Sequence, residues 1–125
     1  MIIGSISENI NLEKRVAITP EIIKKYKSLG FEVYLGKNYA SHLGIKDEIF
    51  ELEGAKIKSD NEVLSNANAI LQMNILDDQN LNKLKEGQIL VGVLNPYLNE
   101  KKLKDIVSKN INCFSLELLP RITRA

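Results

Sequence analysis

The sequence predicts an α/β domain in which a mostly parallel sheet is covered by helices on both faces, giving three layers. Two observations lead to this prediction. Short apolar runs of strand length recur along the whole chain, and segments with helical spacing separate most of them. Strands that are apolar almost throughout are typical of parallel sheets, because both faces of such sheets are buried.

Six segments are predicted to be strands because each is short and rich in β-branched or aromatic residues. They are residues 1–6, 31–35, 55–58, 69–73, 89–94 and 111–118.

The clearest helix begins at Thr19-Pro20-Glu21. Thr19 is expected to cap the helix, Pro20 suits the first helical position, and Glu21 favours the positive end of the helix dipole. Apolar residues then fall on one face, and Gly30 ends the helix. The other helices are expected at residues 46–53, 61–66, 80–85 and 99–109.

Right-handed crossovers between these strands give a doubly wound, flavodoxin-like sheet, which is Rossmann-like but lacks a glycine-rich fingerprint. The chain has 125 residues and no internal repeat or linker-like tract, so residues 1–125 are predicted to form a single domain. We expect ligands to bind beyond the carboxyl ends of the strands, as they do in open α/β sheets.

Composition excludes several classes of partner. The apolar content is 44%, the charged content is 26% and the net charge is +1, so neither nucleic acid nor a bilayer surface is an expected partner. No apolar segment approaches the roughly 20 residues of a membrane span. Without a signal peptide, and with Cys113 as its one cysteine, the chain is expected to be cytoplasmic. Cys113 is expected to be a small buried hydrophobe on an inner strand.

Several familiar catalytic motifs are missing. The sequence has neither a dinucleotide fingerprint nor a phosphate-binding loop of the GxxxxGK[ST] type. With His42 as the one histidine, no histidine-based metal cluster or catalytic triad can form, and His42 is expected to lie on the surface. The pair Asp77-Asp78 is interpreted as a turn and helix cap.

Three places could bind a ligand. Arg15 lies in the polar loop after the first strand, where it could pair with a carboxylate or phosphate or simply be exposed. Asn95, at the end of the fifth strand, could contact a ligand or form a turn before Pro96. The terminal segment Arg121-Ile122-Thr123-Arg124 could form an anion site at a helix start or a basic tail.

The chain resembles the N-terminal domain shared by alanine dehydrogenases and the alpha subunit of proton-translocating NAD(P) transhydrogenase. The resemblance covers essentially the whole chain, and its first and last motifs are the most specific. The motifs are residues 13–20 (EKRVAITP), 29–33 (LGFEV), 53–57 (EGAKI), 69–71 (AIL), 84–87 (LKEG) and 120–125 (PRITRA).

The resemblance separates the two kinds of enzyme. Alanine dehydrogenases hold pyruvate with an arginine, a lysine and a histidine, and these positions fall on Arg15, Asn74 and Asn95. Asparagine cannot act as a general acid or base near neutral pH, so the transhydrogenase is favoured. The chain departs from that family at Gln72, usually a lysine, and at Ile75-Leu76, usually Ala-Pro.

The resemblance implies the N-terminal part of an NAD(H)-binding alpha subunit that exchanges hydride with NADP(H), coupled to proton translocation. It implies that Arg121, Ile122, Thr123 and Arg124 contact NAD. A second, NAD-binding Rossmann domain would complete the site, so the isolated chain is expected to be inactive. Expected partners are that domain, the NADP-binding and membrane components, and a second copy in a homodimer. The location would be cytoplasmic, peripheral to the inner membrane.

Two alternatives stay open. The chain could be the substrate-side domain of an alanine dehydrogenase, or a stand-alone binding or assembly module.

Overall fold

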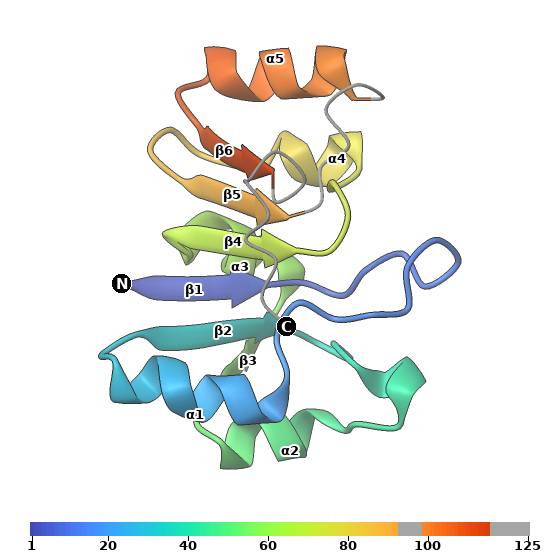
Figure 1. The fold of residues 1–125 in the computed structure, drawn as a ribbon, viewed down its shortest axis with the longest axis vertical. Coiled ribbons are helices and arrows are strands. Elements are labelled where there is room, and N and C mark those ends of the chain that lie inside the picture. The colour runs from blue at the N-terminus through green and yellow to red at the C-terminus, as the bar shows by residue number, and fades with distance from the viewer. Residues whose placement is uncertain (93–98, 116–125) are drawn as a thin grey trace, which may run out of the picture.

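The computed structural model describes residues 1–92 and 99–115, in which parallel strands form one sheet (Figure 1). The strands are β1 (Ile2–Ser5), β2 (Glu32–Gly36), β3 (Lys56–Lys58), β4 (Ala69–Gln72), β5 (Ile89–Gly92) and β6 (Asn112–Ser115). Each lies within a predicted strand or differs from it by one or two residues. Residues 93–94 and 116–118, which were also predicted to be strand, lie outside the described ranges.

The strand order is β3-β2-β1-β4-β5-β6. The chain winds outward from β1 to β3, crosses back to β4 beside β1, and winds outward again to β6. This confirms the doubly wound parallel sheet and refines its order, because the order is the six-stranded Rossmann one and β3 lies outside β2. The direction of winding reverses between β1 and β4, which is where such folds place their ligands.

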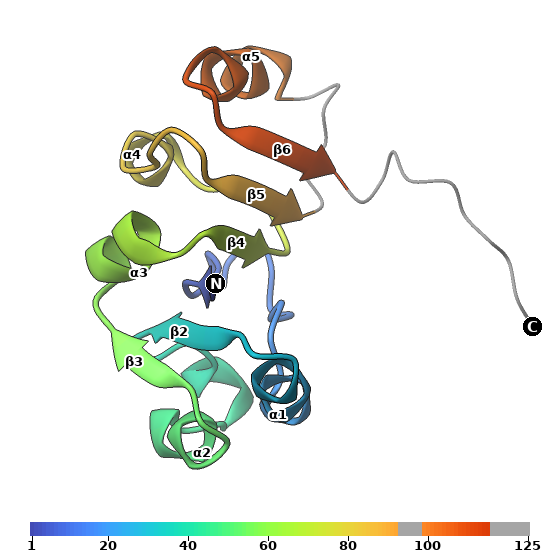
Figure 2. The ribbon, with the colours of Figure 1, turned by 90° about the vertical axis from the view of Figure 1, so that its left-hand side faces the viewer.

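Helices cover the sheet on both faces (Figure 2). The helices α1 and α2 belong to the first winding, and their apolar side chains join one core cluster; those of α3, α4 and α5 join the other. The bounds are α1 (Pro20–Ser28), α2 (Asp47–Leu52), α3 (Asp60–Asn66), α4 (Asp78–Leu81) and α5 (Glu100–Ser108), with a 3₁₀ turn η1 (Ser41–Leu43). In the part of the chain that the structure describes, no helix is long and apolar enough to cross a membrane.

The start of α1 differs in one respect from its prediction. Pro20 lies in its first turn and Gly30, with φ +91°, follows its end, as expected. However, the Thr19 hydroxyl accepts no hydrogen bond from the helix. Pro20 has a fixed φ that favours the helix start, so α1 begins here without a side-chain cap. The side chain of Asp77 does cap α4, accepting from Asn80 N at 2.8 Å, which confirms that interpretation.

Gly4 allows helix α3 to pack directly against the centre of the sheet. A Cβ at this position would lie 2.7 Å from Ala67 Cβ and 2.8 Å from Val63 Cγ1, closer than carbon atoms approach each other. The helix therefore sits low over β1 and β2, and Val63 and Leu64 are fully buried in the cluster beneath it.

One half of one sheet face carries no helix in the described residues (Figure 2). The strand register brings Leu71, Val91 and Phe114 into one row across β4, β5 and β6. Phe114 is 52% exposed at the end of this row, so an apolar patch faces outward. Cys113 lies half-buried on β6, which is the edge strand of the described sheet. The expectation that it occupies an inner strand is therefore wrong for the described residues.

Candidate functional site

A cleft of about 570 Å³ lies where β1 and β4 end, at the point where the winding reverses. Its walls come from the loop of residues 6–19, from the segment that joins β4 to α4, and from the start of α5. Another hollow, of about 650 Å³, runs between α4 and α5 and is lined mainly by their polar surface side chains. We take the cleft at β1 and β4 as the candidate site because the sheet topology directs ligands there.

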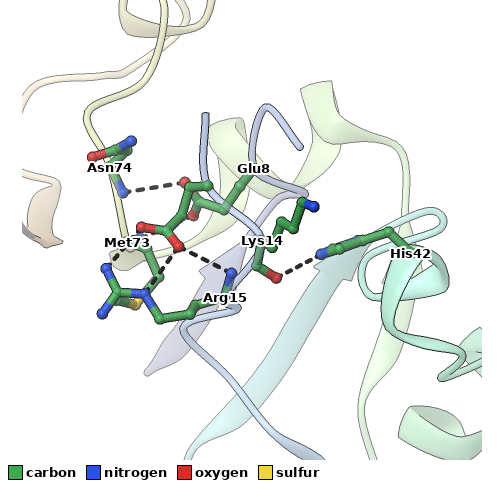
Figure 3. A network of polar contacts seen from close by, with 7 residues as sticks. Glu8, Lys14, Arg15, His42, Met73 and Asn74 are labelled. Carbon is green, nitrogen blue, oxygen red and sulfur yellow. Dashed lines mark hydrogen bonds and ion pairs between the residues drawn. The ribbon is translucent and has the colours of Figure 1, made fainter. Parts of the chain in front are cut away.

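Glu8 lies on the wall of this cleft and is 8% exposed. Its Oε2 accepts hydrogen bonds from Gln72 Nε2 (2.7 Å) and from the backbone N–H of Met73 (2.9 Å), and its Oε1 accepts one from the backbone N–H of Asn74 (3.1 Å). A carboxylate thus joins the loop after β1 to the end of β4 across more than sixty residues of sequence (Figure 3). Burial raises the pKa of Glu8, and the backbone N–H groups of Met73 and Asn74 oppose that rise.

Gln72, the last residue of β4, is 3% exposed. Its side chain holds the Glu8 carboxylate by a hydrogen bond. Its Oε1 accepts from Ile6 N (2.8 Å) and Ser5 Oγ (3.0 Å), while its Nε2 donates to Ile6 O (3.1 Å) and to Glu8. Both ends of the amide are therefore used, and the backbone of β1 is tied to β4 beyond the last ladder pair that joins them, Gly4–Ile70. Gln72 departs from the family pattern, and the sequence left its role open. In the structure its side chain is a buried amide that joins β1 to β4.

Tyr39 extends this network behind the loop. Its hydroxyl lies 2.8 Å from Ser5 Oγ and accepts from the backbone N–H groups of Ala17 and Ile18, both at 3.1 Å. Burial raises the pKa of Tyr39 to about 12, so the phenol stays protonated in the physiological range. One phenol thereby fixes the segment that leads from the cleft loop into α1.

His42 holds the same loop from its other side, as Figure 3 shows. Its Nε2 lies 2.7 Å from the backbone oxygen of Lys14, and the side chain is partly buried. The expected surface histidine is therefore a loop contact, donating through the tautomer that carries its proton on Nε2.

Arg15 forms a two-pronged ion pair with Glu13. Its Nε and Nη2 donate to Glu13 Oε2 (2.9 Å) and Oε1 (2.8 Å), and its backbone N–H donates to Oε2 at 3.0 Å. The Glu13 side chain is 13% exposed and that of Arg15 70%. Hydrogen bonds from Arg15 lower the pKa of Glu13 to about 2.

This pair predicts a specific loss of stability in acid. A carboxylate whose folded pKa is about 2, against 4.5 ordinarily, stabilises the fold above pH 4.5 and loses that contribution as the pH falls toward 2. The variant Arg15→Ala should be slightly less stable than the parent at pH 7, and the difference should shrink below pH 4. Urea unfolding at pH 7, 5 and 3 measures this. The control is Lys24→Ala, on the exposed face of α1; a difference for Arg15→Ala that stays constant with pH would contradict the assignment.

The ionisable side chains that line the cleft already have partners within the described residues. Glu8 is bound as above, Asp77 caps α4, and Lys102 Nζ lies 3.4 Å from Asp78 Oδ1. Asn74 also lines the cleft, and its side-chain amide makes no hydrogen bond to any described residue. The described region of this cleft thus presents the Asn74 amide to a ligand, while each of its ionisable side chains makes a hydrogen bond or an ion pair within the domain.

The structure places one of the predicted site residues in the cleft. Asn74 lies in the cleft, whereas the guanidinium of Arg15 is bound to Glu13 and does not belong to the cleft wall. Asn95 and the segment Arg121-Ile122-Thr123-Arg124 lie outside the described residues. A role for any of them in binding stays a prediction.

Sequence reasoning missed Glu8 and Tyr39 and left the role of Gln72 open. One signal was available: β1 and β4 are apolar strands that both end on a polar residue, Ser5 and Gln72. Polar residues that end two neighbouring parallel strands meet at one edge of the sheet.

The fold and the cleft together define a class of protein. The strand order and the cleft at the reversal point are those of a doubly wound, ligand-binding α/β domain, and the turn after β1 lacks the glycine-rich phosphate-binding sequence of that class.

The chain belongs to the family described as alanine dehydrogenase/PNT, N-terminal domain, which matches residues 4–125. It is 36% identical to an NAD(P) transhydrogenase subunit alpha chain of Rickettsia prowazekii, over all of this chain and 34% of that protein. It is 30% identical to the alanine dehydrogenase of Methanococcus maripaludis, over all of this chain and 34% of that protein.

A solved structure of transhydrogenase from Sinorhizobium meliloti superimposes with a TM-score of 0.92 at 29% identity, covering 98% of this chain and 37% of the other. The chain thus spans about a third of the length of these relatives.

Proposed function

We propose that this chain is the N-terminal part of an NAD(H)-binding alpha subunit of proton-translocating NAD(P) transhydrogenase. It supplies one wall of a crevice for the nicotinamide cofactor. A second, nucleotide-binding domain supplies the opposite wall, and an NADP(H)-binding component faces the crevice. The similarity to transhydrogenase alpha subunits over the whole chain supports this proposal.

The observation that carries the proposal is the place of Asn74 in the cleft, since its neutral amide can neither give nor take a proton near pH 7. A bound nicotinamide supplies or accepts a hydride, a proton with its electron pair, so transfer from NADPH to NAD⁺ gives NADP⁺ and NADH without a protein acid or base. Reductive amination of pyruvate to alanine, in contrast, requires protons to be delivered and removed. Asn74 cannot do this. The cleft therefore favours transhydrogenase over the alanine dehydrogenase that the same family includes.

The described residues fit one portion of a dinucleotide site only. The turn after β1 reads Ile6-Ser7-Glu8-Asn9, so it carries the Glu8 carboxylate in the turn that in Rossmann folds supplies glycine amides to the pyrophosphate. Because a carboxylate repels phosphate, we assign the phosphates of NAD(H) to the second domain. Within this chain, Arg121, Ile122, Thr123 and Arg124 are proposed to reach the cofactor from the end of the domain.

Location and assembly follow from the same proposal. The subunit is proposed to be cytoplasmic and peripheral to the inner membrane when bound to its membrane component. The exposed row that ends in Phe114 supports an assembled state, proposed to be a homodimer of the complete subunit, because patches of this kind are usually covered.

Reconstitution tests the proposed activity. The chain is mixed with the separately produced remainder of the Rickettsia relative and with the NADP(H)-binding component of a transhydrogenase. We expect hydride transfer from NADPH to acetylpyridine adenine dinucleotide, an NAD analogue with a distinct absorbance, only when all three components are present. Omitting this chain is the control.

Two results would reject the proposal in favour of an alternative. Oxidation of NADH that depends on both pyruvate and ammonia would identify an alanine dehydrogenase. A failure of every nicotinamide reaction, with the chain folded and bound to the other components, would leave a binding or assembly module.

A further inference from the structure

Glu8 is the one carboxylate that joins both strands at the reversal point of the described sheet. It accepts hydrogen bonds from three N–H groups, those of the Gln72 side chain and of the Met73 and Asn74 backbone. Each carboxylate oxygen has at least one donor within 3.1 Å, and the side chain is 8% exposed. An arrangement of this kind fixes the backbone of residues 73 and 74 relative to β1.

The backbone of residues 73 and 74 places the side chain of Asn74 in the cleft. Its amide lines the cleft and makes no hydrogen bond to any described residue, so the backbone sets where this side chain starts and the amide can turn to meet a ligand. The backbone N–H of Asn74 donates a hydrogen bond to Glu8 Oε1, which Figure 3 shows as a dashed line. A small rotation of this backbone would move the amide by a distance that matters for recognition.

We propose that Glu8 is a positioning residue for the cleft. Its carboxylate, held by Gln72, sets the backbone of Met73 and Asn74 and thereby the position from which the Asn74 side chain reaches the carboxamide or hydroxyl groups of a bound ligand. The identity of that ligand as a nicotinamide nucleotide rests on the proposed function.

The charge state of Glu8 controls this arrangement. As a carboxylate it accepts from all three donors, but the protonated acid presents an O–H toward one of them and one hydrogen bond is lost. The titratable groups around it are Glu13 on the same loop, the Tyr39 phenol behind it, and Asp77 and Lys102 on the opposite cleft wall. Glu13, a like charge, adds to the effect of burial in raising the pKa of Glu8.

The test compares the parent with Glu8→Gln, in which an amide NH₂ meets one of the same donors. In the complex with the remainder of the Rickettsia relative, the variant should bind NAD⁺ about tenfold more weakly at pH 7, as misplaced contacts do. For the parent, affinity should fall as the pH is lowered toward 4.5, through the raised pKa of Glu8. For the variant, affinity should not change over that range. Glu48→Gln, on the exposed side of α2, is the matched control and should behave as the parent.

A purely structural role would lower the melting temperature of Glu8→Gln and leave the affinity of the folded complex and its pH profile unchanged, and this result would overturn the inference. If the parent complex itself fails to bind NAD⁺, the proposed function is wrong. The assignment of the ligand as a nicotinamide nucleotide is then wrong as well.

A measurement on the parent chain alone decides the positioning, even if the variant does not fold. The amide proton signals of Met73 and Asn74 should shift together as Glu8 is protonated, because both N–H groups donate to its carboxylate. Signals that do not move together during an acid titration would overturn the assignment.

Discussion

Replacing Gln72 with leucine should lower the free energy of unfolding by about 3 kcal/mol, because several buried polar groups lose their partner at once. The backbone N–H and C=O of Ile6, together with Ser5 Oγ, lose hydrogen bonds of 2.8 to 3.1 Å. Glu8 loses one of its three donors and keeps its charge in a buried place. Leucine has a similar volume, so the loss reports unsatisfied polar groups and little change in packing.

Urea unfolding at pH 7 measures this effect. The control is Gln79→Leu, since Gln79 is an exposed glutamine on α4, where the same substitution should change stability by less than about 0.5 kcal/mol. If the two variants are equally stable, Gln72 does not join β1 to β4 as the structure shows.

The variant Tyr39→Phe should lower the free energy of unfolding by about 2 kcal/mol, because it deletes one hydroxyl and leaves one buried and one partly buried N–H group without an acceptor. Those groups belong to Ala17 and Ile18, and the hydroxyl also pairs with Ser5 Oγ. The aromatic ring itself is retained. It packs edge-on against Phe50 at a centroid distance of 5.6 Å and should stay there.

The loss should also be local. Amide hydrogen exchange should accelerate at Ala17 and Ile18, while exchange in the centre of β1 and β4 should change only by the global loss of stability. Tyr26→Phe, on the partly buried side of α1, removes a hydroxyl that makes no hydrogen bond to a described residue and serves as the control. Unchanged exchange at Ala17 and Ile18 in Tyr39→Phe would show that the phenol does not hold the loop.

The fold could be predicted from the sequence because its signals are local. Apolar runs and helical spacing placed each strand and helix to within a few residues, and Pro20 and Gly30 marked the limits of α1. The exact length of α4 could not be predicted, because a helix of four residues is fixed mainly by the Asp77 cap and by burial of Leu81.

The candidate site could be predicted only partly. Its place at the end of β1 followed from the topology of parallel sheets, and Asn74 followed from the family resemblance. The partnership of Glu8 with Gln72 spans 64 residues and leaves no periodic pattern in the sequence. The same holds for the contact of Tyr39 with Ala17 and Ile18, because long-range side-chain hydrogen bonds depend on tertiary packing.

The central claim is that this chain forms one wall of a nicotinamide crevice at the end of β1 and β4. The most direct test is amide chemical-shift mapping of the isotope-labelled chain, mixed with the unlabelled remainder of the Rickettsia relative and titrated with NADH. The account predicts that shifts gather at Ser7, Asn74 and Asp77, and that NADH at micromolar concentration causes none when the chain is alone. Shifts that gather instead on α2 and β3, at the opposite side of the sheet, would contradict it.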